Sequence, residues 1–199
     1  MSRAVGQVDP RKSEAILDAA TELFGEKGAA ATMDEIARRA GVSKQTLYNR
    51  YSSKLDVARA LAVRRSDAIT APLRSEGDPE TVLTAYASAL LTKIVHGEAG
   101  ASLRGLAMVA PEAPDIAAAI YDGGPGQSLR RLSTWLIEQD RRGLLRVPDP
   151  IHAAEIFSGM ALGHSHLRSL LDVDHPDGDR IPERARETAR RFIRAFAPD

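Results

Sequence analysis

The stretch ATMDEIARRAGVSKQTLYNRYSSK, residues 31–54, carries start and stop signals for two short helices. Thr32 and Glu35 have the spacing of a capping box, in which each side chain bonds the other residue's backbone N–H at the first turn of a helix. Gly41 ends that helix, and Ser43 is suited to cap the next one. Helices this short do not persist alone in water, so we expect neighbouring helices to hold them.

Helical signals continue on both sides of this stretch, and strand signals do not occur. Apolar residues at helical spacing, proline at first turns and glycine at ends predict helices near residues 10–27, 53–69, 79–96, 103–109, 114–121, 125–141, 151–171 and 185–196. The expected fold is therefore all-α, with a three-helix N-terminal domain over residues 1–56 and a larger helical domain over residues 57–199. The boundary falls in the fourth helix.

Composition excludes several classes of site. The chain of 199 residues has no cysteine, which removes disulfides, thiolate metal sites and cysteine nucleophiles. It shows no signal-peptide pattern and no apolar run of membrane-spanning length. We expect a cytoplasmic protein without a membrane partner.

Positive charge is concentrated beside the two short helices. The whole chain is neutral, yet residues 42–65 contain six basic residues and one acidic residue. This excess suits contact with phosphates, although a solvated helix face is the alternative explanation. Two short helices joined by a glycine turn have the spacing of a helix-turn-helix, whose second helix enters the major groove of DNA. The residues predicted from this pattern to contact DNA are Ser43, at the start of the second helix, and Lys44, Gln45, Thr46, Tyr48, Asn49, Arg50 and Lys54.

At these residues the sequence resembles the TetR family of bacterial one-component regulators. The family pattern has a threonine cap, an Ile-Ala pair, Gly-Val-Ser, Thr-Leu-Tyr, an aromatic residue and a lysine. It is matched by Thr32, Ile36, Ala37, Gly41, Val42, Ser43, Thr46, Leu47, Tyr48, Tyr51 and Lys54. The resemblance implies that the second helix reads bases and that Thr32, Tyr48 and Lys54 touch phosphates. Arg50 departs from the pattern, so both a base contact and a phosphate contact remain open for it.

The later part of the chain contains the stretch LRGLAMVAPEAPDIAAAIYDGGPGQSLRRLSTWLIEQDRRGLLRVPDPIHAAEIFSGMALG, residues 103–163. This stretch resembles the ligand-binding and dimerising half of the AefR-like branch of that family. The helix predicted over residues 151–171 is apolar on more than one face, so it must be covered on both sides. One covering is the subunit's own core, and the other is a second subunit; the alternative is that both faces belong to one core. The predicted dimer interface comprises Gly159, Gly163, Leu167, Phe192, Ile193 and Phe196.

A small-molecule effector is the second partner that the resemblance implies. Aromatic, methionine and histidine side chains of the middle helices are the candidates to line a mostly apolar pocket, although each is also typical of core packing. The candidates are Tyr86, Leu90, Met108, Trp135, Phe157, Met160 and His164. His164 in particular suits either a hydrogen bond inside the pocket or a satisfied place in the core.

Other patterns do not support a catalytic or metal site. DVDHPDGD, residues 172–179, resembles a calcium loop only superficially, because Pro176 replaces a ligand and Gly178 comes one place late. His164 and His166 face different directions on a helix. GGPG lacks the lysine of a phosphate-binding loop. We therefore expect no enzyme activity, no metal and no cofactor.

The sequence thus predicts a homodimeric transcriptional repressor that a small, mostly apolar effector releases from a palindromic double-stranded DNA operator. Two alternatives remain. One is a DNA-binding regulator without a small-molecule effector. The other is an α-helical protein that binds a small molecule and has lost DNA binding.

Overall fold

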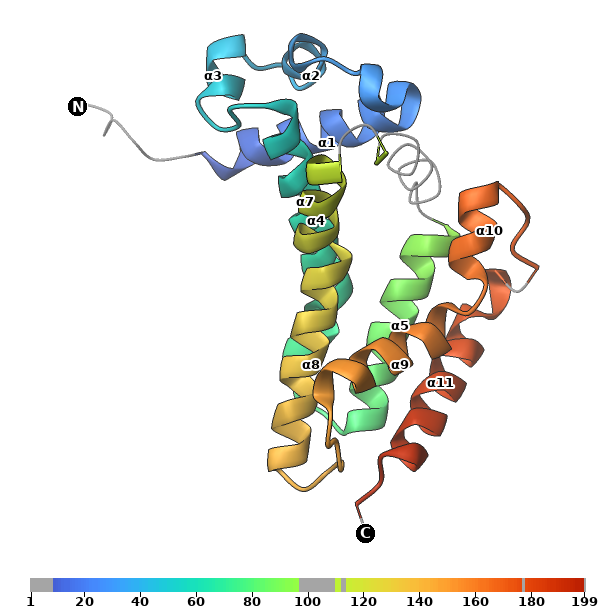
Figure 1. Cartoon of the computed structure of the whole chain (residues 1–199). Helices are drawn as coiled ribbons and strands as arrows, with labels where there is room; N and C mark the ends of the chain where they lie inside the picture. The colour runs from blue at the N-terminus through green and yellow to red at the C-terminus, as the bar shows by residue number, and fades with distance from the viewer. Residues whose placement is uncertain (1–8, 97–109, 112–113, 177, 199) are drawn as a thin grey trace. The chain divides into compact units, whose positions relative to one another are not determined.

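The computed structural model describes residues 9–96, 110–111, 114–176 and 178–198, and these residues form helices and no strands. The elements are α1 (Pro10–Lys27), η1 (Gly28–Ala30), α2 (Met33–Arg39), α3 (Lys44–Tyr48), α4 (Lys54–Thr70), η2 (Ala71–Arg74), α5 (Pro79–Val95), α7 (Pro114–Gly123), α8 (Pro125–Arg141), α9 (Pro150–Leu162), α10 (Ser165–Leu171), η3 (Gly178–Arg180) and α11 (Ile181–Ala195), as Figure 1 shows. The all-α prediction is confirmed. The helix predicted over residues 103–109 lies outside the described residues.

The chain packs into two compact units that divide between Leu61 and Ala62. This division lies inside α4, as does the boundary predicted after residue 56. Each unit has an apolar core of its own. Unit 1 below means the part that ends at Leu61, and unit 2 means the part that begins at Ala62.

Unit 1 is built on a small core shared by α1, α2, α3 and the first part of α4. Ile16 of α1, Ile36 of α2, Leu47 of α3 and Val57 of α4 are all fully buried in it. The short helices α2 and α3 therefore gain from tertiary packing the stability that their length alone does not supply.

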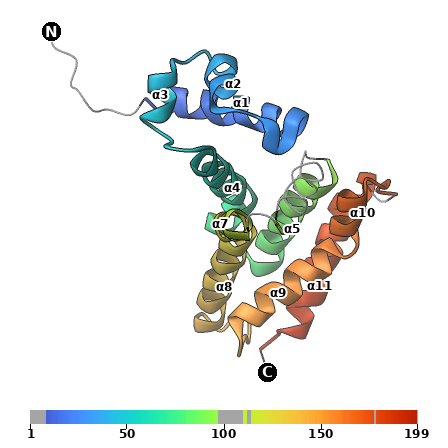
Figure 2. The same cartoon turned by 45° about the horizontal axis from the view of Figure 1, so that its top comes forward.

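Unit 2 has a larger core between α5, α9 and α11, which lie side by side in Figure 2. Tyr86, Phe157 and Phe192 are buried there in a row, with ring centroids 5.8 Å apart for the first pair and 5.1 Å for the second. The second pair meets edge to face, an arrangement favoured by the ring quadrupoles. α8 packs against the same core through α9.

The contact between the later part of α4 and α8 is polar. Ser66 and Ser128 are buried, and their hydroxyl oxygens lie 2.9 Å apart. Arg131 of α8 donates to the Thr70 hydroxyl at 2.9 Å and pairs with Asp67 at 2.5 Å. Hydrogen bonds and an ion pair therefore join this part of α4 to α8, and Ile69 of α4 also packs against the apolar core of unit 2.

The prediction of a single helix over residues 151–171 is wrong. The structure has two helices, α9 and α10, separated at Gly163, whose φ of +46° suits glycine and strains other residues. Arg184 of α11 donates to the Leu162 carbonyl at 2.6 Å and to the Ser165 hydroxyl at 3.0 Å. One guanidinium thus satisfies a carbonyl at the end of α9 and a hydroxyl at the start of α10.

Candidate functional site

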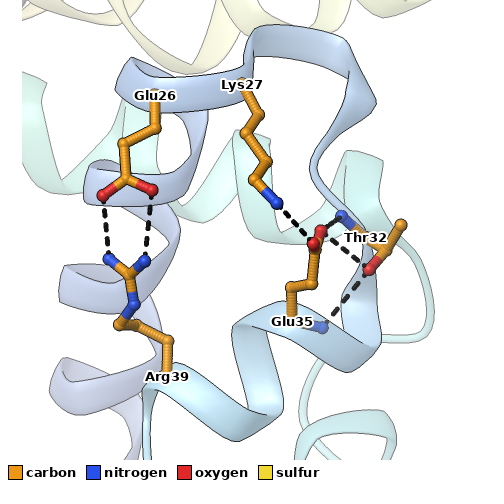
Figure 3. Close-up of polar contacts among 5 residues, drawn as sticks. All are labelled: Glu26, Lys27, Thr32, Glu35 and Arg39. Carbon is orange, nitrogen blue, oxygen red and sulfur yellow. Dashed lines mark hydrogen bonds and ion pairs between the residues drawn. The ribbon is translucent and has the colours of Figure 1, made fainter.

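The first turn of α2 is fixed by the capping box that the sequence predicts. The Thr32 hydroxyl accepts from the Glu35 backbone N–H at 3.3 Å, and the Glu35 carboxylate accepts from the Thr32 N–H at 3.0 Å. Lys27 also donates to this carboxylate at 2.6 Å, as Figure 3 shows. The Lys27 ammonium first, and then the Thr32 donors, lower the pKa of Glu35 from 4.5 to about 2. These contacts set where α2 begins relative to α1.

A second ion-pair group ties the other end of α2 to α1. The Arg39 guanidinium forms two bonds to the Glu26 carboxylate, at 3.0 and 3.1 Å, and one to Glu22 at 2.8 Å. Figure 3 shows the paired Arg39 and Glu26 contacts. The hydrogen bond from Arg39 is the largest cause that lowers the pKa of Glu26. α2 is therefore held at both ends.

The turn into α3 and the cap of α3 also follow the sequence prediction. Gly41 has φ +65°, and the Ser43 hydroxyl accepts from the Thr46 N–H at 3.0 Å. Leu47 points into the core of unit 1, where Val42 and Tyr51 also pack. These three apolar contacts determine which side of α3 faces the core.

The opposite side of α3 is polar and exposed. Lys44, Gln45 and Asn49 are exposed, and 49% of Tyr48 is accessible. The remaining predicted DNA-binding residues also reach the surface of unit 1: Thr32 and Ser43 are exposed, and Thr46, Arg50 and Lys54 are half-buried. The structure thus places all nine predicted DNA-binding residues on unit 1, from the start of α2 to the start of α4.

Two of these cations have protein partners that sequence reasoning missed. Lys44 Nζ lies 2.5 Å from Asp34 Oδ2, and Arg50 Nη1 donates to the Ser13 hydroxyl. Asp34 precedes Lys44 by ten residues, and Ser13 precedes Arg50 by 37. Neither spacing corresponds to a local motif, so the sequence carries no signal for these pairs.

The predicted effector residues that the structure describes are divided between the core of unit 2 and its surface. Tyr86, Leu90 and Phe157 are buried in the core of unit 2. Burial raises the pKa of the Tyr86 phenol to about 12, against a smaller opposing effect of its hydrogen bond with Ser158. These residues pack on one another, as expected from the alternative in which they belong to the core and do not line a pocket.

The other effector candidates are dispersed. Trp135 is half-buried and lines an open depression of about 450 Å³, together with Leu73, Glu76 and Arg142. Met160 and His164 are exposed, so His164 is not a core histidine. Met108 lies outside the described residues.

The predicted dimer residues divide into surface and core. Leu167 is 49% exposed, Gly159 is exposed, and Ile193 and Phe196 are half-buried. Phe192 is fully buried between aromatic rings of its own subunit, so its assignment to the interface is wrong. Gly163 is exposed, but it ends α9 instead of forming a small-residue row with Gly159 on one helix.

An exposed apolar surface does remain on α9 and α10. It consists of Ile156 and Met160, four residues apart on α9, and of Leu167 and Leu171, four residues apart on α10, whose accessible fractions range from 37% to 63%. We call it the α9–α10 surface. Large apolar side chains grouped in this way are typical of an interaction site.

Metal-ligand groups and membrane helices do not occur within the described residues. No three histidine or acidic side chains there approach closely enough to hold a metal ion. No helix there is long and apolar enough to cross a membrane. The loop around Asp172 and His175 lines an open polar depression of about 320 Å³.

Two family models match the chain. The one described as "Bacterial regulatory proteins, tetR family" matches residues 16–61, and the one described as "AefR-like transcriptional repressor, C-terminal domain" matches residues 81–198.

Curated relatives match part of the chain. The HTH-type transcriptional activator FasR of Mycolicibacterium smegmatis is 40% identical over 97 residues, which are 46% of this chain and 44% of FasR. The HTH-type transcriptional regulator SrpR of Pseudomonas putida is 36% identical over 66 residues, which are 33% of this chain and 31% of SrpR. The chain thus spans less than half the length of each of these relatives.

Solved structures match nearly the whole chain. A TetR-family transcriptional regulator from Mesorhizobium loti has a TM-score of 0.78 at 24% identity, covering 96% of this chain and all of that one. The flavonoid-responsive regulator FrrA has a TM-score of 0.68 at 29% identity, covering 96% of this chain and 99% of that one.

Proposed function

Because the chain belongs to the TetR family of bacterial regulatory proteins, we propose that it is a homodimeric repressor that a small, mostly apolar effector releases from a near-palindromic operator. The family assignment confirms both resemblances inferred from the sequence, and it makes the chain a DNA-binding transcriptional regulator.

One observation carries the proposal for DNA contact: α3 has a buried apolar side and an exposed polar side. Leu47 anchors the buried side, while Lys44, Gln45 and Tyr48 are exposed. Lysine suits guanine acceptors, glutamine suits adenine, and a tyrosine hydroxyl suits a phosphate oxygen. The proposed contacts are the nine surface residues of unit 1 described above.

The proposal of a homodimer rests on the α9–α10 surface. A second copy of the chain offers the same apolar surface, so a two-fold contact covers both copies at once. Two copies of α3 held about 34 Å apart would then meet successive major grooves on one side of the DNA. Light scattering of the purified protein at micromolar concentration is expected to give the mass of a dimer. A monomeric mass would count against this proposal.

The proposal of an apolar effector rests on the flavonoid-responsive relative FrrA, which is 29% identical over nearly all of the chain. Flavonoids are flat aromatic molecules, so a pocket for one is lined mostly by apolar and aromatic side chains. An effector releases the protein only if it binds the DNA-free conformation more tightly than the DNA-bound one. If titration of aromatic compounds into an operator complex releases no DNA, a regulator without a small-molecule effector becomes the better proposal.

Activation is the second candidate function, because FasR is an activator and is 40% identical over 97 residues. A transcription assay with the operator placed at a promoter separates the two. A repressor lowers transcript on addition of the protein, and an activator raises it.

Selection of DNA from a random pool with the purified protein tests the central proposal. We expect an enriched near-palindrome whose half-sites are about one helical turn apart. If no sequence is enriched at low salt, operator recognition is refuted, and the protein is instead a small-molecule-binding one that has lost DNA binding.

Two substitutions separate phosphate contacts from base contacts. Lys54→Ala should weaken binding to all duplexes and reduce the salt slope by about one. Arg50→Ala should relax preference at one operator position by about 1 to 3 kcal/mol if its guanidinium reads a base. A uniform loss for Arg50→Ala would assign that side chain to phosphate alone.

A further inference from the structure

The pair of Asp34 and Lys44 lies within the proposed DNA-contact region. Lys44 is the first residue of α3, and Asp34 is in the first turn of α2. Their charged atoms are 2.5 Å apart, and their side chains are 66% and 53% exposed. Ion pairs this exposed contribute little to folding stability. Stability therefore does not explain why an acidic side chain lies beside a proposed DNA contact.

The pairing changes what Lys44 offers to DNA. A free lysine carries a flexible point charge that binds any phosphate, whatever the sequence. Beside Asp34 the charge is offset, so the attraction to phosphates is reduced. The ammonium has three N–H donors, and the bond to Asp34 uses one of them. The other two N–H donors remain available. They can bind an acceptor only where the held side chain points.

Holding the side chain in place also favours a directed contact. Lysine loses rotamer freedom when it is fixed, and the ion pair removes part of that freedom before DNA arrives. An acceptor placed at the held ammonium, such as the O6 or N7 of a guanine, then gains a hydrogen bond at a lower entropic cost.

Arg50, near the other end of α3, provides a comparison. It is half-buried, and it donates to the hydroxyl of Ser13 on α1. A neutral hydroxyl directs the guanidinium without cancelling its charge, whereas Asp34 does both for Lys44. Glu22 and Glu26 of α1 bind Arg39, and Glu35 of α2 binds Lys27. Both of these cations are outside the proposed DNA contacts.

We propose that Asp34 is a specificity-determining residue of the DNA-binding unit. It offsets the charge of Lys44 and fixes its direction, so that DNA of arbitrary sequence gains little from Lys44 while an operator with a correctly placed acceptor gains a hydrogen bond. This inference rests on the proposed operator recognition through α3.

The test compares two duplexes. One has the sequence that the wild-type protein enriches from random DNA, and the other is a scrambled sequence of equal composition. Binding of each is measured by fluorescence anisotropy between 50 and 200 mM salt. Asp34→Asn releases the full charge of Lys44, so the slope of log K against log salt for the scrambled duplex should steepen by about 0.9. This corresponds to an additional loss of about 3.5-fold over that salt range.

The ratio of enriched to scrambled affinity should fall in Asp34→Asn by about threefold to eightfold at 100 mM salt. Asp34→Glu retains the charge and should retain the wild-type ratio. Glu76→Gln removes one acidic charge from an exposed loop of unit 2, so it is the matched control and should leave both the slope and the ratio unchanged. Thermal melting of each variant verifies that unit 1 remains folded.

The Lys44→Ala variant tests whether Asp34 acts through Lys44 or only through its own negative charge. If Asp34 acts through Lys44, Asp34→Asn no longer lowers the ratio when Lys44 is alanine. The inference is overturned if Asp34→Asn leaves the ratio unchanged, or if it lowers the ratio equally in the Lys44→Ala background. A wild-type protein that enriches no sequence would overturn the proposed function itself, which distinguishes the two failures.

Discussion

Gly163 provides a sharp test of the break between α9 and α10. Its φ of +46° with ψ of −125° is a conformation that residues with a side chain occupy only under strain, at about 1 to 3 kcal/mol. A Cβ added there would lie 2.9 Å from Nη2 of Arg184, which is too close. The guanidinium must therefore move away from the Leu162 carbonyl and from the hydroxyl of Ser165, which is 3% exposed.

Loss of these hydrogen bonds adds a second cost. A buried polar group that loses its partner costs about 1 to 3 kcal/mol. Together with the backbone strain, Gly163→Ala should lower the free energy of unfolding by about 2 to 6 kcal/mol. Arg184→Ala removes the hydrogen bonds without the strain, so it should cost less than Gly163→Ala.

Gly159→Ala is the matched control, because it makes the same chemical change one turn earlier. Gly159 lies inside α9, and a Cβ there meets no atom within 4 Å. Alanine is the better helix former, so this substitution should stabilise the subunit by about 0.5 to 1 kcal/mol. The two glycines should therefore give effects of opposite sign.

The assay is urea unfolding followed by circular dichroism at two protein concentrations. A stability change that depends on concentration reports on association, and one that does not reports on the subunit itself. If Gly163→Ala is as stable as wild type at both concentrations, the strained break and the role of Arg184 are refuted.

Three further predictions concern other parts of the fold. The pKa of Glu35 is about 2 in the folded protein and 4.5 ordinarily, so its stabilising effect is present above pH 4.5 and is lost as pH falls towards 2. Melting temperatures between pH 6 and pH 2.5 should therefore fall less steeply in Glu35→Gln than in wild type. Phe157→Ala, which empties a fully buried site between two rings, should cost about 3 to 5 kcal/mol in urea unfolding, and a cost below about 1 kcal/mol would contradict the packing described. Arg131→Met removes the bonds to Thr70 and Asp67 and should cost about 1 to 2 kcal/mol, with amide hydrogen exchange increased in α4 if these bonds fasten it to α8.

The proposed DNA-contact region shows which features were accessible from sequence. The caps at Thr32 and Ser43 were predicted because each joins residues three apart in the chain. The contacts of Lys44 with Asp34 and of Arg50 with Ser13 were not predicted, because they depend on how α1, α2 and α3 pack together. Those packed contacts decide how much charge and freedom each cation retains.

The helix boundaries show the same distinction in unit 2. The apolar pattern of residues 151–171 is continuous, and a glycine inside such a pattern does not by itself end a helix. The end of α9 at Leu162 is accompanied by a contact from Arg184, which is 22 residues further along the chain. A distant side chain thus supplies the hydrogen bonds for a break that local periodicity did not predict.

The sequence by itself determined the helices with strong local signals, the turn at Gly41 and the family, because capping and helical periodicity act over a few residues. Only the tertiary structure decided which apolar side chains are buried and which are exposed, because these side chains look alike in the sequence. Phe157 and Phe192 are buried against each other, while Met160 and Leu167 remain exposed on the α9–α10 surface. Periodicity places a side chain on one side of a helix, but the neighbouring helices determine whether that side becomes core or surface.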